Sequence, residues 1–185
     1  MSGFLDDSDD CSTVEVGEKG PDFTLDSERG EKWRLSEQSG TVTALLFYPK
    51  DETLVCTRQM CSVRNNWADY LEAKAAVVGI SSGTIEEHLI FSQKHRLPLP
   101  LLTDVNREVT SIYGRHWLFP MQLTRAVVII DAKGIVRHRE VMLRAFRPPD
   151  KSVLTSIHAA RTDSLDEHYR RLTESYKIRN PFSRG

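Results

Sequence analysis

The sequence lacks both a long apolar run and an excess of charge of one sign. Its 25 basic and 26 acidic side chains leave a formal net charge of -1. Such a balance offers no basic face for nucleic acid and no polybasic surface for lipid. No basic segment followed by an apolar one opens the chain, and no run is long enough to span a bilayer. We therefore expect a cytoplasmic protein without nucleic acid or membrane partners.

Cysteine is scarce as well, since only Cys11, Cys56 and Cys61 occur. An odd number of cysteines in a chain of this size does not suit a secreted disulfide framework, and in a reducing compartment cysteines more often serve chemistry or metal binding. The C-x4-C spacing of Cys56 and Cys61 lies within the range of zinc fingers. No second ligand pair follows, however, because His88 and His95 are seven residues apart. We expect neither a metal nor a cofactor, and a zinc-binding or non-catalytic module stays as the alternative to an enzyme.

No internal repeat divides the chain, and its 39% of hydrophobic residues suffice for one domain with a sizeable core. The acidic stretch DDSDD predicts a disordered head over residues 1–13. The main domain is expected over 14–162, with the stretch RPPD at 147–150 closing its core. Beyond it, SLDE is a capping box that predicts an amphipathic helix, so residues 163–185 form a C-terminal helical appendage.

Three short apolar runs indicate the core: TALLFYP from Thr43, AAVVGIS from Ala75 and RAVVIID from Arg125. Such runs are typical of strands buried on both faces, and they favour an α/β fold with a central sheet of largely parallel strands covered by helices. Residues 23–35 predict a hairpin, and DAKG at 131–134 predicts a tight turn between two strands.

Helical patterns separate the apolar runs. One helix is predicted from about residue 55 to 74, a second from 84 to 96 and a third from 106 to 113. The second begins with TIEE, a capping box in which Thr84 is the N-cap. The apolar face of the first helix is expected to carry Trp67, Tyr70 and Leu71.

Cys56 falls in the first turn of a predicted helix, where backbone N–H groups and the helix dipole favour the nucleophilic thiolate. Pro49 ends the preceding strand, so the loop after it lies at the carboxyl edge of the sheet, where open α/β folds place their sites. Thr53 is placed to turn its hydroxyl toward the sulfur. Each residue alone has an ordinary explanation, as a buried cysteine, a strand end and a helix N-cap. Together they favour a reactive thiol.

The stretch PKDETLVC at 49–56 resembles the P-x-x-x-T-x-x-C signature of the peroxiredoxins, which are thiol peroxidases on an elaborated thioredoxin fold. The resemblance covers about residues 14–160. A second cysteine five residues on is similar to the Q-type subgroup, also called bacterioferritin comigratory proteins. The resemblance implies a thioredoxin-like fold with a central mixed sheet flanked by helices, an N-terminal hairpin and a C-terminal helical extension.

The resemblance also implies a role for each residue. Cys56 is the peroxidatic cysteine that attacks the O–O bond of hydrogen peroxide or an organic hydroperoxide. Thr53 orients the peroxide and Pro49 shields the sulfur. Arg125, which from the residues alone is equally a charge at a strand end, aligns with the active-site arginine that stabilises the thiolate and the developing charge on oxygen.

Cys61 is implied as the resolving cysteine, which captures the sulfenic acid of Cys56 as an intramolecular disulfide before further oxidation. Five helical residues advance about 7.5 Å, beyond the roughly 7 Å between Cα atoms that a disulfide spans. We therefore expect the first turns of the helix to unwind in each cycle. A thioredoxin-like dithiol then reduces the bond, and the chain is expected to be a monomer or a weak homodimer. The nearest enzymatic alternative, a thioredoxin-like disulfide reductase, ordinarily shows C-x-x-C.

The chain departs from the family pattern at two positions. Gln59 stands where many Q-type proteins carry a glutamate, so no role of that carboxylate is carried over. Val55 stands where a glycine often precedes the reactive cysteine, which makes the approach to the sulfur more apolar. The roles of Cys11 and of the final helix stay open. The apolar stretch YGRHWLFP is expected to pack over the core, with Trp117 and Phe119 at a pocket rim or a dimer face as the alternative.

Overall fold

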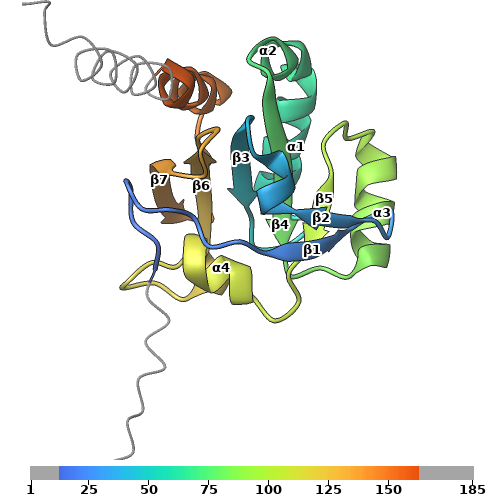
Figure 1. Cartoon of the computed structure of the whole chain (residues 1–185). Coiled ribbons are helices and arrows are strands. Elements are labelled where there is room, and N and C mark those ends of the chain that lie inside the picture. The colour runs from blue at the N-terminus through green and yellow to red at the C-terminus, as the bar shows by residue number, and fades with distance from the viewer. Residues whose placement is uncertain (1–12, 163–185) are drawn as a thin grey trace, which may run out of the picture.

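The structure is a computed structural model, and it describes residues 13–162. Residues 1–12 of the predicted head, with Cys11, and the helix predicted from Ser164 lie outside the described residues. Figure 1 shows a single central sheet with helices on both of its faces. Within 13–162 no helix combines the length and the apolarity that crossing a bilayer requires.

The sheet has seven strands in the order β2-β1-β5-β4-β3-β6-β7. Their bounds are Thr24–Ser27 (β1), Lys32–Arg34 (β2), Val42–Phe47 (β3), Ala75–Ser81 (β4), Leu101–Thr103 (β5), Thr124–Ile130 (β6) and Val136–Leu143 (β7). Only β3 with β4 and β4 with β5 pair in parallel among these strands, and the other pairs are antiparallel. The prediction of a largely parallel sheet was therefore wrong. The two predicted hairpins, β1–β2 and β6–β7, account for part of the difference, because a tight turn reverses the chain.

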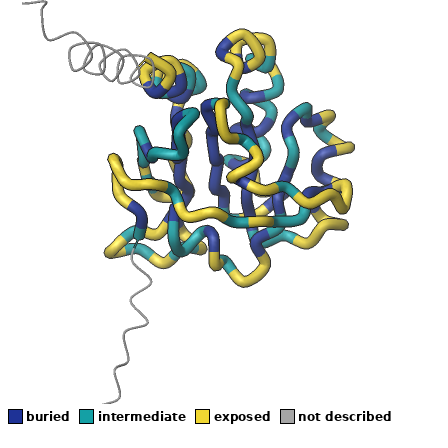
Figure 2. Tube along the Cα trace, viewed as in Figure 1, coloured by how far each residue is buried: buried dark blue, intermediate teal, exposed yellow. Residues whose placement is uncertain are grey.

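Alternate residues of the central strands enter two separate cores, which explains their continuous apolar runs. Ala44 and Leu46 of β3 belong to the core under the larger helices, whereas Leu45 and Phe47 belong to the core on the other face. Figure 2 shows the buried segments concentrated along these strands. The helices are Leu54–Asn65 (α1), Trp67–Glu72 (α2), Ile85–His95 (α3), Glu108–Tyr113 (α4) and a segment over residues 150–162.

The single helix predicted over residues 55–74 is broken at Asn66. The side-chain amide of Asn66 donates to the carbonyl of Ser62 at 2.8 Å, and a side chain that bonds to the backbone in this way competes with the helical ladder. The break changes which residues face the core. Tyr70 is buried as predicted, but Leu71 is 59% exposed.

The helix over residues 150–162 extends the core beyond RPPD, which the sequence analysis had interpreted as its end. Val153, Ile157 and Ala160 repeat at helical spacing and join the core that contains α1. Prolines are compatible with the start of a helix because the first N–H groups have no partner within it. The prolines at 148 and 149 therefore precede a further core helix, and the prediction that RPPD closes the core was wrong.

Candidate active site

Cys56 lies in the first turn of α1, which follows β3 after a single loop. The strand ends at Phe47, a loop covers residues 48–53, and α1 begins at Leu54. Cys56 is thus the third residue of the helix, within the turn whose backbone N–H groups lack helical acceptors. Its side chain is fully buried.

The guanidinium of Arg125 contacts the Cys56 sulfur. Arg125 is in β6, whose register places its neighbour Ala126 opposite Phe47, and only 1% of the residue is exposed. Nη2 donates to Cys56 Sγ at 3.3 Å and to the Arg144 carbonyl at 3.3 Å. Nη1 donates to the amide oxygen of Gln59. Among the described residues no carboxylate pairs with Arg125, so negative charge on the sulfur would compensate this buried cation.

Pro49 and Thr53 line one pocket together with Cys56. The pocket measures about 630 Å³ and is also lined by Val55 and Arg144. Thr53 is the N-cap of α1, and its hydroxyl donates to the carbonyl of Lys50 at 3.4 Å. The expected hydrogen bond from this hydroxyl to the Cys56 sulfur is therefore not made in this conformation. The Lys50 bond is long, so its loss on rotation of the hydroxyl costs little.

The structure does not bring Cys61 to Cys56. Both are free thiols on one uninterrupted helix, and each has its own partner. Cys61 Sγ lies 3.8 Å from Nδ1 of His95 at the end of α3, while Cys56 contacts Arg125. A disulfide between them therefore requires a change in α1, as the helical spacing predicted.

A buried polar network that the sequence did not predict lies next to the loop before Cys56. His88 is fully buried, and its Nδ1 lies 2.5 Å from Asp51 Oδ2. The Tyr48 hydroxyl donates to Asp51 Oδ1 at 2.7 Å, and Ser81 Oγ lies 3.4 Å from His88 Nε2. Burial, followed by the charge of Asp51, raises the pKa of Tyr48 well above its ordinary value. The spacing of His88 three residues before the core residue Phe91 was the available signal for its burial.

The profile of the AhpC/TSA family matches residues 16–139 of this chain. The chain belongs to this family. Peroxiredoxin Bcp of Bacillus subtilis is 33% identical over 131 residues, which cover 66% of this chain and 82% of the relative. The putative peroxiredoxin bcp of Coxiella burnetii is 35% identical over 130 residues, which cover 67% of this chain and 86% of the relative. Chloroplastic peroxiredoxin Q of Triticum aestivum is 37% identical over 129 residues, which cover 69% of this chain and 59% of the relative.

These relatives place the chain among the Q-type, Bcp-like peroxiredoxins, which are thiol-dependent peroxidases. Membership in this class of enzymes favours the enzymatic interpretation over the alternative of a zinc-binding module. The crystal structure of peroxidoxin BcpB from Mycobacterium tuberculosis superimposes with a TM-score of 0.68 at 27% identity, covering 80% of this chain and 99% of that one. A reduced 2-Cys peroxiredoxin of Plasmodium vivax matches with a TM-score of 0.71 at 24% identity, covering 85% and 84%, which shows the fold alone. The predicted thioredoxin-like mixed α/β fold is thereby confirmed.

The departure at Gln59 has a physical consequence in this peroxiredoxin. Gln59 is buried and presents a neutral amide oxygen to Arg125. A glutamate there would offer the guanidinium a carboxylate that competes with the sulfur. With glutamine, the full charge of Arg125 is available to Cys56.

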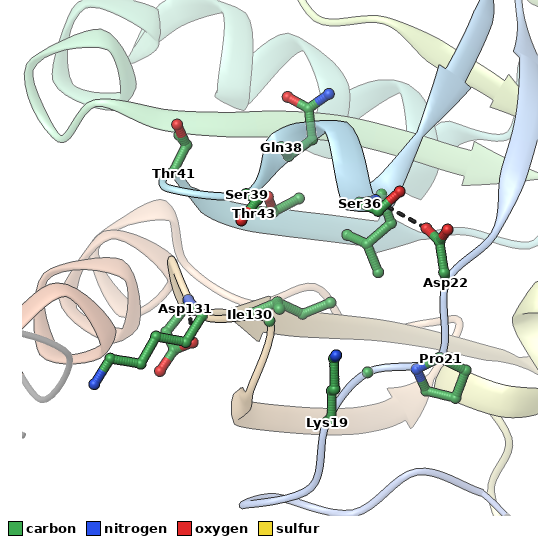
Figure 3. A pocket seen from close by; sticks show the side chains of 14 residues that line it. Lys19, Pro21, Asp22, Ser36, Gln38, Ser39, Thr41, Thr43, Ile130 and Asp131 are labelled. Carbon is green, nitrogen blue, oxygen red and sulfur yellow. Dashed lines mark hydrogen bonds between the residues drawn. The ribbon is translucent and has the colours of Figure 1, made fainter.

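Two other features lie away from the thiols of this peroxiredoxin. A pocket of about 500 Å³ is lined by Thr43 and Ile130, among other residues (Figure 3). These two residues pair across β3 and β6 at the end of β3 that lies away from the loop before Cys56. The loop expected to pack over the core instead leaves Trp117 87% exposed, with its ring stacked on His116. Within the described residues no three His, Cys, Asp or Glu side chains gather as metal ligands would.

Proposed function

We propose that Cys56 is the peroxidatic cysteine, which reduces hydrogen peroxide and organic hydroperoxides. The 3.3 Å contact between Arg125 Nη2 and Cys56 Sγ carries the proposal. A buried guanidinium without a carboxylate partner lowers the free energy of an adjacent thiolate, which is the nucleophilic form of cysteine. The thiolate attacks one peroxide oxygen, the O–O bond breaks, and Cys56 becomes a sulfenic acid. The departing oxygen takes up a proton and leaves as water or an alcohol.

Arg125, Thr53 and Pro49 assist this attack. As the O–O bond breaks, negative charge develops on the departing oxygen, and the fixed charge of Arg125 stabilises it. The Thr53 hydroxyl turns from the Lys50 carbonyl to orient the peroxide, which is supported by the 3.4 Å length of its present bond. Pro49 lines the same pocket and shields the sulfur from water.

Cys61 resolves the sulfenic acid after the first turns of α1 unwind. The opposite end of this helix is held to the segment over residues 150–162, because Asp150 accepts hydrogen bonds from Ser62 and, at 3.4 Å, from the C-cap residue Asn66. These bonds support an opening confined to the turns before Ser62. Helix ends open locally at low free energy because few bonds hold them.

A thioredoxin-like dithiol then reduces the Cys56–Cys61 disulfide by exchange and restores both thiols. A cycle that depends on such a reductant suits the cytoplasm, where dithiol reductants are maintained. Because the disulfide forms within one chain, the cycle requires only a monomer or a weak homodimer.

Serine variants of the two cysteines test this assignment. With one equivalent of hydrogen peroxide and no reductant, we expect Cys61→Ser to consume the peroxide once and stop with a sulfenic acid on Cys56. A sulfenic-acid-specific reagent followed by mass spectrometry detects that adduct. Cys56→Ser is expected to consume no peroxide, and Cys11→Ser serves as the control that behaves as wild type. Peroxide consumption by Cys56→Ser at the wild-type rate would refute the assignment.

A further inference from the structure

We propose that His95 is the general base that takes the proton from Cys61, with Glu52 as the acidic group that orients the imidazole. The inference rests on the proposed function, because it concerns the step in which Cys61 attacks oxidised Cys56. His95 of α3 and Glu52 of the loop before α1 do not line the pocket of Cys56. The inference gives them a role in the later step that forms the disulfide.

The imidazole of His95 lies between a thiol and a carboxylate. Its Nδ1 is 3.8 Å from Cys61 Sγ, within hydrogen-bonding reach of sulfur. Its Nε2 is 3.6 Å from Glu52 Oε1, which is an ion-pair distance. The three groups come from α1, α3 and the loop over residues 48–53, so folding alone brings them together. A nucleophile, a base and a group that orients the base recur in this order wherever a thiol or hydroxyl is activated.

The surroundings of His95 select the tautomer that can accept a proton at Nδ1. Nε2 is buried and finds no acceptor within hydrogen-bond distance among the described residues, and Glu52 is the carboxylate near it. A proton on Nε2 faces that negative charge and leaves Nδ1 free to accept. The ring is also held in place by Phe91, whose centroid is 4.9 Å away in an edge-to-face contact.

The charges around His95 support proton transfer in both directions. Glu52 Oε2 accepts from Lys94 at 2.6 Å, and this hydrogen bond holds the pKa of Glu52 below its usual value. The carboxylate therefore remains charged at neutral pH and stabilises the imidazolium that forms. His95 is also the last residue of α3, where the helix dipole favours a cation. Arg64 of α1 opposes this with its own positive charge, which its Nη1 brings to the His95 carbonyl at 2.7 Å.

The chemistry of the step balances without a further reactant. Nδ1 of His95 takes the Cys61 proton, and the opening of the first turns brings oxidised Cys56 to the Cys61 thiolate, which stays beside His95. The thiolate attacks the sulfenic sulfur, so that the S–S bond forms as the S–O bond breaks. The hydroxide leaves as water after taking the proton from the imidazolium. The Cys56 sulfur is reduced and the Cys61 sulfur is oxidised.

Single-turnover kinetics of His95→Gln test the role of His95. Stopped-flow fluorescence separates a peroxide-dependent phase, the oxidation of Cys56, from a later phase independent of peroxide concentration, the formation of the disulfide. We expect the first phase to be unchanged and the second to be about tenfold slower at pH 7, since an ordinary thiol is only a few per cent ionised there. The deficit should disappear at alkaline pH, where the thiol ionises unaided. Glu52→Gln should slow the same phase, and His158→Gln, at an exposed position, should change neither.

The outcomes separate this inference from the proposed function. An unchanged second phase at pH 7 in His95→Gln, with the phase absent in Cys61→Ser, would overturn the role of His95 and leave the resolving role of Cys61 standing. A second phase slowed equally at all pH values would indicate a structural role and would also overturn the inference. Persistence of the second phase in Cys61→Ser would refute the proposed function itself.

Discussion

Replacing Arg125 by glutamine is expected to slow the reaction of Cys56 with hydrogen peroxide by about 10²- to 10³-fold, the usual cost of removing one group that stabilises developing charge. The guanidinium contacts the sulfur at 3.3 Å, and its other described acceptors are neutral. Its removal therefore destabilises both the Cys56 thiolate and the transition state of the attack on peroxide. The second-order rate constant for the reduced variant, measured by stopped flow across pH, gives the size of the effect.

The matched control for this prediction is Arg58→Gln, which removes the same charge from an exposed position on α1. We expect less than a threefold change for that variant. Part of the deficit in Arg125→Gln should be recovered at alkaline pH, because the thiol then ionises without help. A rate within threefold of wild type for Arg125→Gln, with the fold intact by circular dichroism, would contradict the part given to Arg125.

Replacing His88 by alanine is expected to lower the free energy of unfolding by about 3–5 kcal/mol, the usual cost of removing one partner from a buried pair. Asp51 would keep the hydrogen bond from Tyr48 but lose its contact with His88 Nδ1. Asp51 belongs to the loop that also carries Thr53, so the peroxide reaction should slow as well. Urea unfolding of the reduced protein measures the loss of stability.

Two further variants serve as comparisons for the loss of stability expected in His88→Ala. Tyr48→Phe removes one hydrogen bond to Asp51 and should cost about 1 kcal/mol. His158→Ala, at an exposed position of the segment over residues 150–162, should stay within about 0.5 kcal/mol of wild type. If His88→Ala destabilised the protein no more than Tyr48→Phe does, the buried pair would not be what holds the loop.

The parts of the fold that were predictable from the sequence are those fixed by local pattern. The runs at β3, β4 and β6 are continuous because both faces of each strand are buried, and the Thr84 capping box sets the start of α3. The antiparallel pairings of β1 with β5 and of β3 with β6 were not predictable in the same way, since they join strands that are distant in the sequence. The break at Asn66 was missed because a single polar residue ends α1 through its own side chain.

In the candidate site too, the residues of a local motif were predictable and the contacts between distant segments were not. Pro49, Thr53 and Cys56 lie within eight residues, so their motif was visible in the sequence and the structure gathers them in one pocket. The role of Arg125 could be predicted only from the family resemblance, since no local pattern distinguishes it from any other charge at a strand end. The contacts of Cys61 with His95 and of Asp51 with His88 span 34 and 37 residues and depend on where α3 packs. No spacing rule predicts contacts of that kind.

The most direct measurement is a map of the cysteines in wild-type protein after less than one equivalent of hydrogen peroxide. Free thiols are blocked, and the protein is digested without reduction and analysed by mass spectrometry. We predict a peptide pair joined between Cys56 and Cys61, with Cys11 blocked as a free thiol. Since an intact α1 keeps these two sulfurs apart, that bond would also show that the helix opens. Unconsumed peroxide together with blocked thiols at both positions would contradict the proposed cycle.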